Sequence, residues 1–135
     1  MSYIKLEELE KRPEISGEEA DQALKFAVGQ VKRNLPQFTD KFQKAYSENN
    51  WYQPTENVDW TTGFWTGEVW LAYEYSHDEA FRAAGEIQME SFLERIDQKI
   101  EVDHHDMGFL YSPSCVAGYK LTGSRIGREG AIKAA

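Results

Sequence analysis

The sequence predicts an all-α fold built from helical hairpins, because three of its features are typical of stacked helix pairs. Apolar residues recur at helical spacing over long stretches of the 135-residue chain. Serine, glycine and proline residues stand where such helices would begin and end. A short pattern also recurs, since Gly63-Phe64 returns 45 residues later as Gly108-Phe109. A period between about 20 and 50 residues is typical of repeated supersecondary units.

The first helix is predicted over about residues 18–35. Ser16 and Glu19 have the S-x-x-E spacing of a capping box, in which each residue satisfies a free backbone N–H of the other. One apolar stripe follows at helical spacing, formed by Ala20, Ala23, Leu24, Ala27 and Val31. Pro36 is expected to end the helix, because proline cannot continue the hydrogen-bond ladder.

Residues 36–62 are predicted to form a long connection without regular structure. They contain Pro36 and Pro54 and show no clear periodicity. They are also rich in aromatic residues, namely Phe38, Phe42, Tyr46, Trp51, Tyr52 and Trp60. Long loops of this kind in compact domains are typically functional or mobile.

Two further hairpins are predicted after this connection. The stretch from Phe64 to Tyr73 is apolar over most of its circumference, which is typical of an inner helix covered on both sides. Ser76 and Glu79 repeat the S-x-x-E spacing and predict the start of a more polar outer helix, whose apolar stripe is Phe81, Ala84, Phe92 and Ile96.

A second apolar segment, residues 109–121, has Pro113 in its predicted first turn, where proline is tolerated. Gly123 stands where a helix C-cap glycine belongs, and residues 121–124 match residues 75–78 of the earlier turn. A more polar helix follows, so this segment repeats the order of the first hairpin.

The chain ends inside what reads as another outer helix, and an array of hairpins must be capped or closed into a ring. We therefore expect residues 1–17 to be a polar lead-in and residues 18–135 to be one portion of a larger helical domain. Ile126 and Ile132 are expected among the apolar residues left exposed. The alternative is a small helical domain with a frayed final helix.

Composition restricts the possible partners. Hydrophobic and charged contents of 41% and 28% are those of a globular chain. A net charge of −8 argues against nucleic acid and against an acidic membrane surface, since both require a basic footprint. The single cysteine excludes an intramolecular disulfide. The chain shows neither a signal-peptide pattern nor about 18 consecutive apolar residues, which predicts a cytoplasmic location.

The run Asp103-His104-His105-Asp106 precedes the repeated Gly-Phe and allows three interpretations. A metal site is disfavoured, because adjacent histidines point in different directions and no second His or Cys cluster exists. A carboxyl at the mouth of an apolar cavity can instead serve as a general acid, with an imidazole beside it. The third interpretation is a helix cap. We favour the cap for Asp103, whereas spacing alone leaves Asp106 balanced between cap and acid.

Trp60 lies in the equivalent loop one repeat earlier, and we expect it at the same end of the array as Asp106. An indole beside a carboxylate is a common arrangement for holding a sugar ring by stacking. Trp65 and Trp70 are expected in the core, because they lie on the apolar helix. Cys115 is expected to be a buried, inert thiol, and no base is identifiable for Ser112.

Three segments of the sequence resemble the unsaturated glucuronyl hydrolases, and most closely the bacterial unsaturated chondroitin disaccharide hydrolases. They are residues 57–67 (NVDWTTGFWTG), residues 71–75 (LAYEY) and residues 103–112 (DHHDMGFLYS). The similarity runs in order from about residue 20 to the last residue. It implies a six-hairpin (α/α)6 barrel, incomplete in this chain, and a full-length enzyme near three times this size.

By resemblance, the protein is a glycoside hydrolase that removes the unsaturated uronic acid from the non-reducing end of lyase-generated glycosaminoglycan disaccharides. A carboxylic acid protonates the C4=C5 vinyl ether, water adds at C5, and the hemiketal opens. No metal or organic cofactor is implied. Asp106 matches one of two essential aspartates, His105 its neighbour, and Trp60 a substrate-contacting tryptophan. The other aspartate is expected beyond residue 135, so the resemblance implies that the active site is incomplete in this chain.

Two alternatives remain open at this stage. One is a non-catalytic helical module that binds carbohydrate or another protein. The other is an unsaturated rhamnogalacturonyl hydrolase, which shares the fold and the chemistry. The sequence leaves the oligomeric state open.

Overall fold

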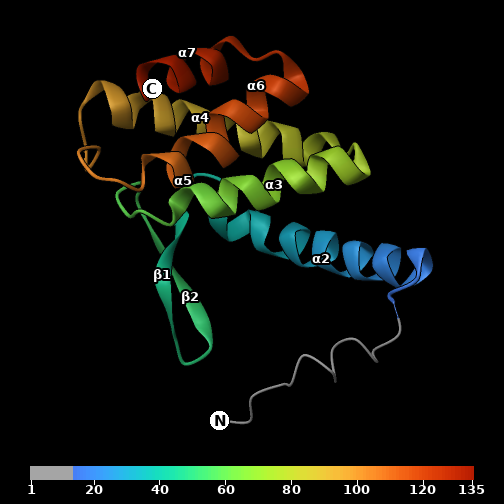
Figure 1. The fold of residues 1–135 in the computed structure, drawn as a ribbon. Coiled ribbons are helices and arrows are strands. Elements are labelled where there is room, and N and C mark those ends of the chain that lie inside the picture. The colour runs from blue at the N-terminus through green and yellow to red at the C-terminus, as the bar shows by residue number, and fades with distance from the viewer. Residues whose placement is uncertain (1–13) are drawn as a thin grey trace.

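A computed structural model describes residues 14–135 as a stack of helices with one β-hairpin projecting from it (Figure 1). The helices are α2 (Gly17–Phe38), α3 (Thr62–Ser76), α4 (Glu79–Asp97), α5 (Met107–Tyr111), the π-helical η1 (Ser112–Val116), α6 (Ala117–Thr122) and α7 (Arg125–Lys133). The strands are β1 (Phe42–Glu48) and β2 (Trp51–Thr55). Most of the predicted lead-in, residues 1–17, lies outside the described residues.

The predicted helical hairpins are confirmed. Helices α3 and α4 form the first hairpin, and the continuous segment α5–η1–α6 forms the second with α7. The first members of the two hairpins pack together, as do the outer helices α4 and α7. Helix α2 lies along the opposite side of α3 (Figure 1). Helix α3 is therefore covered on two sides, which accounts for its nearly uniform apolar sequence.

The core lies between these helices and contains the tryptophans expected there. Trp65 and Trp70 are 2% and 1% exposed. The indole Nε1 of Trp65 donates a hydrogen bond of 2.8 Å to the backbone carbonyl of Phe38, which ties the end of α2 to α3. Trp70 packs against Gly85 of α4 and Gly118 of α6, where an added Cβ would lie within 3 Å of its ring. The absence of side chains at these glycines allows three helices to approach one another.

The repeat seen in the sequence is confirmed at the level of individual hydrogen bonds. His77 (φ 54°) and Gly123 (φ 72°) both adopt the left-handed conformation and end α3 and α6. Ser76 and Thr122 each lie two residues before the N-cap of an outer helix. Their hydroxyls donate to the backbone carbonyls four residues earlier in the chain, at 2.6 and 2.8 Å. Both hairpins therefore turn by the same device.

Replacing Gly123 with alanine is expected to lower the free energy of unfolding by about 1 kcal/mol, because a Cβ is disfavoured at positive φ. Gly29→Ala, in the middle of α2, is the matched control and is expected to raise stability by about 0.5–1 kcal/mol. Urea denaturation of the two variants measures both changes. Equal effects from the two substitutions would show that the turn does not depend on the glycine.

The start of α2 confirms the predicted capping box, whereas its end does not follow the prediction. Ser16 accepts a hydrogen bond from the backbone N–H of Glu19, and the Glu19 carboxylate accepts one from that of Ser16. Pro36 was expected to end the helix but lies inside it. The last turn carries Leu35 and Phe38 into the core, and this burial outweighs the lost hydrogen bond.

Residues 36–62 were predicted to lack regular structure, and this was wrong for β1 and β2. The strands pair antiparallel, with Glu48 opposite Trp51. Asn49 and Asn50 connect them with φ of 52° and 62°, as a two-residue hairpin turn requires. Only Phe42, 1% exposed, anchors the strands in the core, with its ring 5.5 Å from that of Phe92.

Two smaller expectations are corrected by the structure. Ser76 does not begin α4; Asp78 does, and its carboxylate accepts from the backbone N–H of Ala80 at 3.0 Å. Pro113 does not lie in the first turn of its helix but at the start of η1, in the middle of a continuous helical segment. A proline has no N–H for the α-helical ladder, and the wider π-turn accommodates it beside Gly67 of α3.

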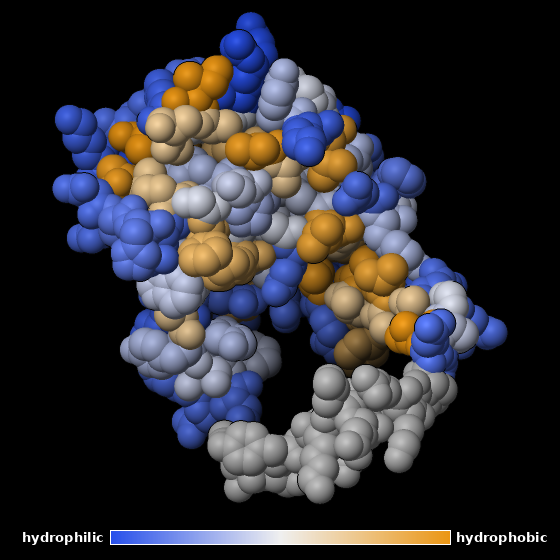
Figure 2. All heavy atoms as spheres, viewed as in Figure 1, coloured by the Kyte–Doolittle hydropathy of each residue, from blue (hydrophilic) through white to orange (hydrophobic). Residues whose placement is uncertain are grey.

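Hydrophobic side chains remain exposed along α2 and α3, as Figure 2 shows. Leu24, Phe26 and Leu71 are 50%, 68% and 65% exposed. Ile132 is also exposed, as expected, whereas Ile126 packs against the core, contrary to expectation. Among the helices of residues 14–135, none is long and apolar enough to cross a membrane.

Candidate functional site

A surface hollow of about 350 Å³ lies between the two loops that precede the inner helices α3 and α5. The loop before α3 contributes Val58, Asp59 and Trp60, and the loop before α5 contributes Glu101, His104 and Asp106. Trp60 and Asp106 were expected at the same end of the array because their loops are equivalent in the repeat. They line the same hollow, which we call the rim hollow.

The structure argues against a side-chain cap, one of the two interpretations that spacing left open for Asp106. Asp106 occupies the N-cap position of α5, but its carboxylate makes no capping hydrogen bond to that helix. The first turn is instead satisfied by its backbone carbonyl, which accepts from the N–H of Phe109 at 2.9 Å. The side chain is 21% exposed and lines the rim hollow. Its carboxylate is therefore free to meet a ligand.

Two imidazoles flank the Asp106 carboxylate. The Nε2 atom of His105 lies 3.4 Å from Oδ1, and the Nδ1 atom of His104 lies 3.9 Å from Oδ2. His105 was the histidine expected at the site, yet its side chain is 93% exposed and stands in solvent. His104 lines the hollow in its place. A repeat and a motif cannot distinguish adjacent histidines, because their orientation depends on the turn.

Hydrogen bonds fix the orientation of His104. Its Nδ1 accepts from the backbone N–H of Asp106 at 3.1 Å, and its Nε2 lies 2.9 Å from the backbone carbonyl of Glu101. An acceptor Nδ1 and a carbonyl partner for Nε2 together place the proton on Nε2. His104 thus links Glu101 to Asp106 within a single loop.

Asp103 was expected to cap the helix, and this was wrong, because the N-cap is Asp106. Asp103 is exposed and does not line the rim hollow. Within residues 14–135, no group of three or more His, Cys, Asp or Glu side chains is arranged to hold a metal ion.

Three half-exposed aromatic rings stand together beside Asp106. Trp60 lies 6.1 Å from Phe64 and 6.3 Å from Phe109 between ring centroids, and the two phenylalanines are 5.5 Å apart. Their residues are 46%, 42% and 50% exposed. Trp60 was expected to face a ligand, but the two phenylalanines were recognised only as part of the Gly-Phe repeat. Their equivalent positions in the two repeats are the signal that places them together.

Behind the rim hollow lies Arg95 of α4, a residue that the sequence patterns did not single out. It is 1% exposed, and burial lowers the pKa of its guanidinium group. The guanidinium donates to the backbone carbonyls of Asp59, Ile100 and Glu101 at 2.8–3.0 Å. It also donates to the side chains of Asn57 and Thr62, at 3.0 and 3.2 Å. These partners belong to both loops of the hollow.

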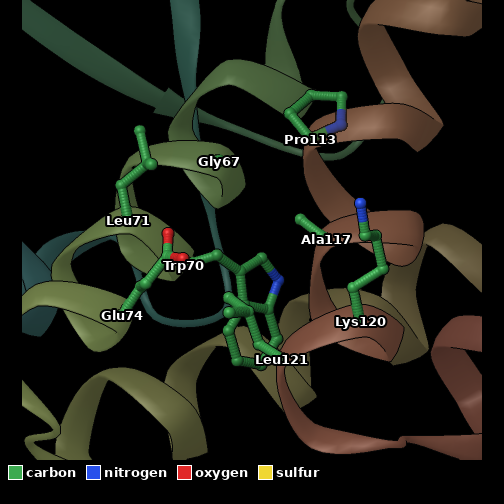
Figure 3. Close-up of a pocket in the computed structure, with 8 residues that line it drawn as sticks. All are labelled: Gly67, Trp70, Leu71, Glu74, Pro113, Ala117, Lys120 and Leu121. Carbon is green, nitrogen blue, oxygen red and sulfur yellow. The ribbon is translucent and has the colours of Figure 1, made fainter.

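A second hollow, of about 310 Å³, lies between α3 and the η1–α6 segment (Figure 3). Trp70 forms its floor, and Glu74 and Lys120 stand on opposite walls (Figure 3). Cys115 is fully buried, as expected, and burial raises the pKa of its thiol to about 11, so the thiol is protonated and unreactive at neutral pH. Neither feature brings together groups with an evident chemical role.

No protein-family model matches the chain. The chain is 45% identical over 123 residues to the unsaturated chondroitin disaccharide hydrolase of Streptococcus pneumoniae, which is 91% of this chain and 31% of that protein. It is 42% identical over 114 residues to the unsaturated glucuronyl hydrolase of Bacillus sp. strain GL1, covering 84% of this chain and 30% of the relative. The chain therefore spans about a third of the length of the curated relatives it matches.

Solved structures give the same result for the fold. Unsaturated glucuronyl hydrolase from Streptococcus agalactiae superposes with a TM-score of 0.87 at 40% identity, covering 93% of this chain and 33% of that one. An aspartate-to-asparagine mutant of the same enzyme, complexed with dGlcA-GalNAc6S, superposes with a TM-score of 0.88 at 39% identity, covering 92% and 33%. The helical hairpins described above thus have the arrangement of about a third of that α/α-barrel fold.

Proposed function

We propose that this chain belongs to the unsaturated glucuronyl hydrolase family, of whose members it spans about a third, and that it supplies one wall of such an enzyme's active site. The proposed substrate is a disaccharide with a C4=C5 unsaturated uronic acid at its non-reducing end. The observation that carries the proposal is the rim hollow, in which a free carboxylate and an exposed indole stand together. In this account Trp60 stacks on the sugar while Asp106 faces its reacting atoms.

The proposed reaction begins with proton transfer to C4 of the vinyl ether by a carboxylic acid. Water then bonds to C5 and releases its proton, which gives a hemiketal. The hemiketal opens by breaking the bond from C5 to the ring oxygen, which leaves a ketone at C5 and a hemiacetal at C1. The hemiacetal then breaks down to an aldehyde and frees the partner sugar. We propose that Asp106 is one of two carboxyl groups required for these steps. A carboxyl group held in place can give a proton to a reacting atom or take one from it.

The two histidines have different proposed roles. His104 accepts a hydrogen bond from the backbone N–H of Asp106 through its Nδ1 atom, so it positions the acid from the wall of the rim hollow. His105 stands in solvent with its Nε2 atom 3.4 Å from the Asp106 carboxylate. We propose that His105 donates to the substrate when a sugar fills the rim hollow.

The charges of the hollow orient the proposed substrate. Asp59, Glu101 and Asp106 line it, and no lysine or arginine of the described residues does. The carboxylate of an unsaturated uronic acid would be repelled by these groups. It is therefore expected to point out of the rim hollow, toward cationic groups that the hollow itself does not provide.

Substrate comparison tests the proposed function. The natural gene product is incubated with an unsaturated chondroitin disaccharide, its saturated counterpart and an unsaturated rhamnogalacturonan disaccharide. The ultraviolet absorbance of the conjugated enol-ether carboxylate should fall with the first, and the saturated sugar should remain intact. Faster loss with the rhamnogalacturonan sugar would favour a related hydrolase. Binding of sugar by a folded protein without any turnover would favour a non-catalytic module.

Trp60→Ala is expected to raise KM for the unsaturated disaccharide by about tenfold and to change kcat less, because aromatic stacking contributes on the order of 1 kcal/mol. Trp51→Ala is the matched control, since Trp51 is 55% exposed on β2 and does not line the rim hollow. Initial rates over a range of substrate concentrations separate the two parameters. Equal KM values for the two variants would remove Trp60 from the proposed site.

A further inference from the structure

Arg95 connects the two loops that form the rim hollow. We propose that it is a positioning residue, which sets the distance between the Trp60 loop and the Asp106 loop and thereby the geometry of the site; this inference rests on the proposed function. Arg95 does not line the hollow and touches none of its proposed substrate-binding atoms. Its effect on chemistry would pass through the backbone segments that it holds.

The environment of Arg95 is unusual for a buried cation. Its five hydrogen bonds end on three backbone carbonyls, one amide oxygen and one hydroxyl, all of them uncharged. No carboxylate of residues 14–135 lies within ion-pair distance of it, although Asp59 and Glu101 are its neighbours through their backbones. Burying a charge without an ion partner costs free energy. We infer that arginine is present here because the several donors of its guanidinium group are required.

One side of the fork holds the loop before α3. The Nη1 atom donates to the Asp59 carbonyl at 2.9 Å and to the Asn57 side chain at 3.0 Å. Asn57 in turn accepts from the hydroxyl of Thr62, the first residue of α3, at 2.7 Å. Trp60 lies between Asp59 and Thr62, so both ends of its short loop are attached to the same guanidinium.

The other side of the fork holds the loop before α5. Nε and Nη2 donate to the carbonyls of Ile100 and Glu101 at 3.0 and 2.8 Å. Glu101 has a φ of 45°, which a side chain-bearing residue adopts only where its surroundings enforce it. The Glu101 carbonyl also meets Nε2 of His104, whose Nδ1 accepts from the N–H of Asp106. A chain of hydrogen bonds therefore runs from Arg95 to the backbone of Asp106.

Arg95 holds both loops at once, and this distinguishes a positioning role from ordinary stabilisation of the core. Helix α4 carries Arg95 on a rigid element, and the planar fork fixes several acceptors at once. A lysine at this site would keep the charge and much of the length, but its single nitrogen cannot serve both loops. The loops would then move independently, and a displacement of about 1 Å between an acid and its substrate can cost about 100-fold in rate.

The test compares Arg95→Lys with Met89→Ala in the natural gene product. Met89 lies on the same helix, is fully buried and faces Gly118 and Gly127 of the second hairpin, away from the rim hollow. Turnover of unsaturated chondroitin disaccharide is measured below the unfolding transition of each variant, and amide hydrogen exchange is measured in parallel. We expect kcat of R95K to fall about 100-fold with faster exchange confined to residues 57–62 and 100–106. M89A should lower the melting temperature yet keep kcat within about twofold.

Three results would overturn the positioning role. They are an unchanged kcat in folded R95K, a loss of kcat in M89A equal to that in R95K, and unchanged exchange at both loops in R95K. If the wild-type protein hydrolyses no unsaturated uronide, the proposed function fails. The hydrogen-exchange comparison then tests by itself whether Arg95 connects the two loops. Faster exchange at both loops in R95K supports the connection, and unchanged exchange overturns it.

Discussion

Asp106→Asn is expected to lower kcat for unsaturated chondroitin disaccharide by about 10²–10⁴-fold, because a positioned acid or base typically contributes that much. The amide has nearly the shape of the carboxylate but cannot exchange a proton with the substrate. Asp106 makes no capping hydrogen bond through its side chain, so this loss should come with little change in stability. A capping aspartate would behave differently, since losing a cap costs about 1 kcal/mol.

Asp103→Asn is the matched control for this prediction. It removes the same charge from the same loop, but Asp103 is exposed and lies outside the rim hollow. Its activity and its free energy of unfolding should both stay near wild-type values, within about 0.5 kcal/mol for stability. Near-normal turnover of D106N in a folded protein would remove Asp106 from the proposed chemistry. Equal losses in the two variants would point to a general effect of charge.

Gly63→Ala is expected to lower the free energy of unfolding by about 3 kcal/mol or more. A Cβ at this position would lie 2.1 Å from the backbone carbonyl oxygen of Phe109 and 2.7 Å from the Cα of Leu110. Overpacking typically costs about 1–3 kcal/mol where side chains can adjust, and here the obstacle is backbone. Helices α3 and α5 would have to separate, which would also displace the loops of the rim hollow.

The repeat supplies the control, because Gly108 is the equivalent glycine of the second hairpin. A Cβ at Gly108 would meet nothing within 4 Å. Gly108→Ala should therefore be neutral or stabilise the helix by up to about 1 kcal/mol. Thermal and urea denaturation of the two variants provide the comparison. Similar stabilities would show that the close approach at Gly63 does not hold the two hairpins together.

The helix boundaries could be predicted where a local capping signal sets them. The Ser16 capping box and the Gly123 cap each mark one boundary, and the structure has both. The apolar stripe predicted for α2 was wrong over most of its length, because Val31 is buried whereas Leu24 and the alanines at 23 and 27 are exposed. The prediction that Pro36 ends α2 was wrong because the lost hydrogen bond is a local cost, whereas the stabilisation comes from the contacts of Phe38. The Phe38 carbonyl accepts hydrogen bonds from Trp65 and Gln88, which are distant in sequence.

The β-hairpin shows a different limit. Its strands show no regular alternation of buried and exposed residues, and Pro54 within β2 argues against a strand. The turn is Asn49-Asn50 rather than the more familiar Asn-Gly pair. Both asparagines adopt positive φ, which this residue tolerates better than most. The Asn49-Asn50 pair is therefore the sequence feature that could have predicted a hairpin turn.

The sequence could predict the residues that face the candidate site, but not the residues that hold them in place. Asp106 and Trp60 stand in equivalent loops of a repeat, so sequence alone could place them at one end of the array. The choice between His104 and His105 depends on a single turn of backbone, and Arg95 donates hydrogen bonds to five acceptors from two loops. Such contacts join residues of no recognisable spacing, and only the folded chain brings them together.

The most direct test of the account is a crystal structure of the natural gene product carrying Asp106→Asn, with unsaturated chondroitin disaccharide bound. The uronate ring should lie in the rim hollow, against the indole of Trp60 and next to the substituted position 106. A sugar bound instead in the hollow between α3 and α6, or along the exposed face of α2, with Trp60 uncovered, would contradict the proposed site.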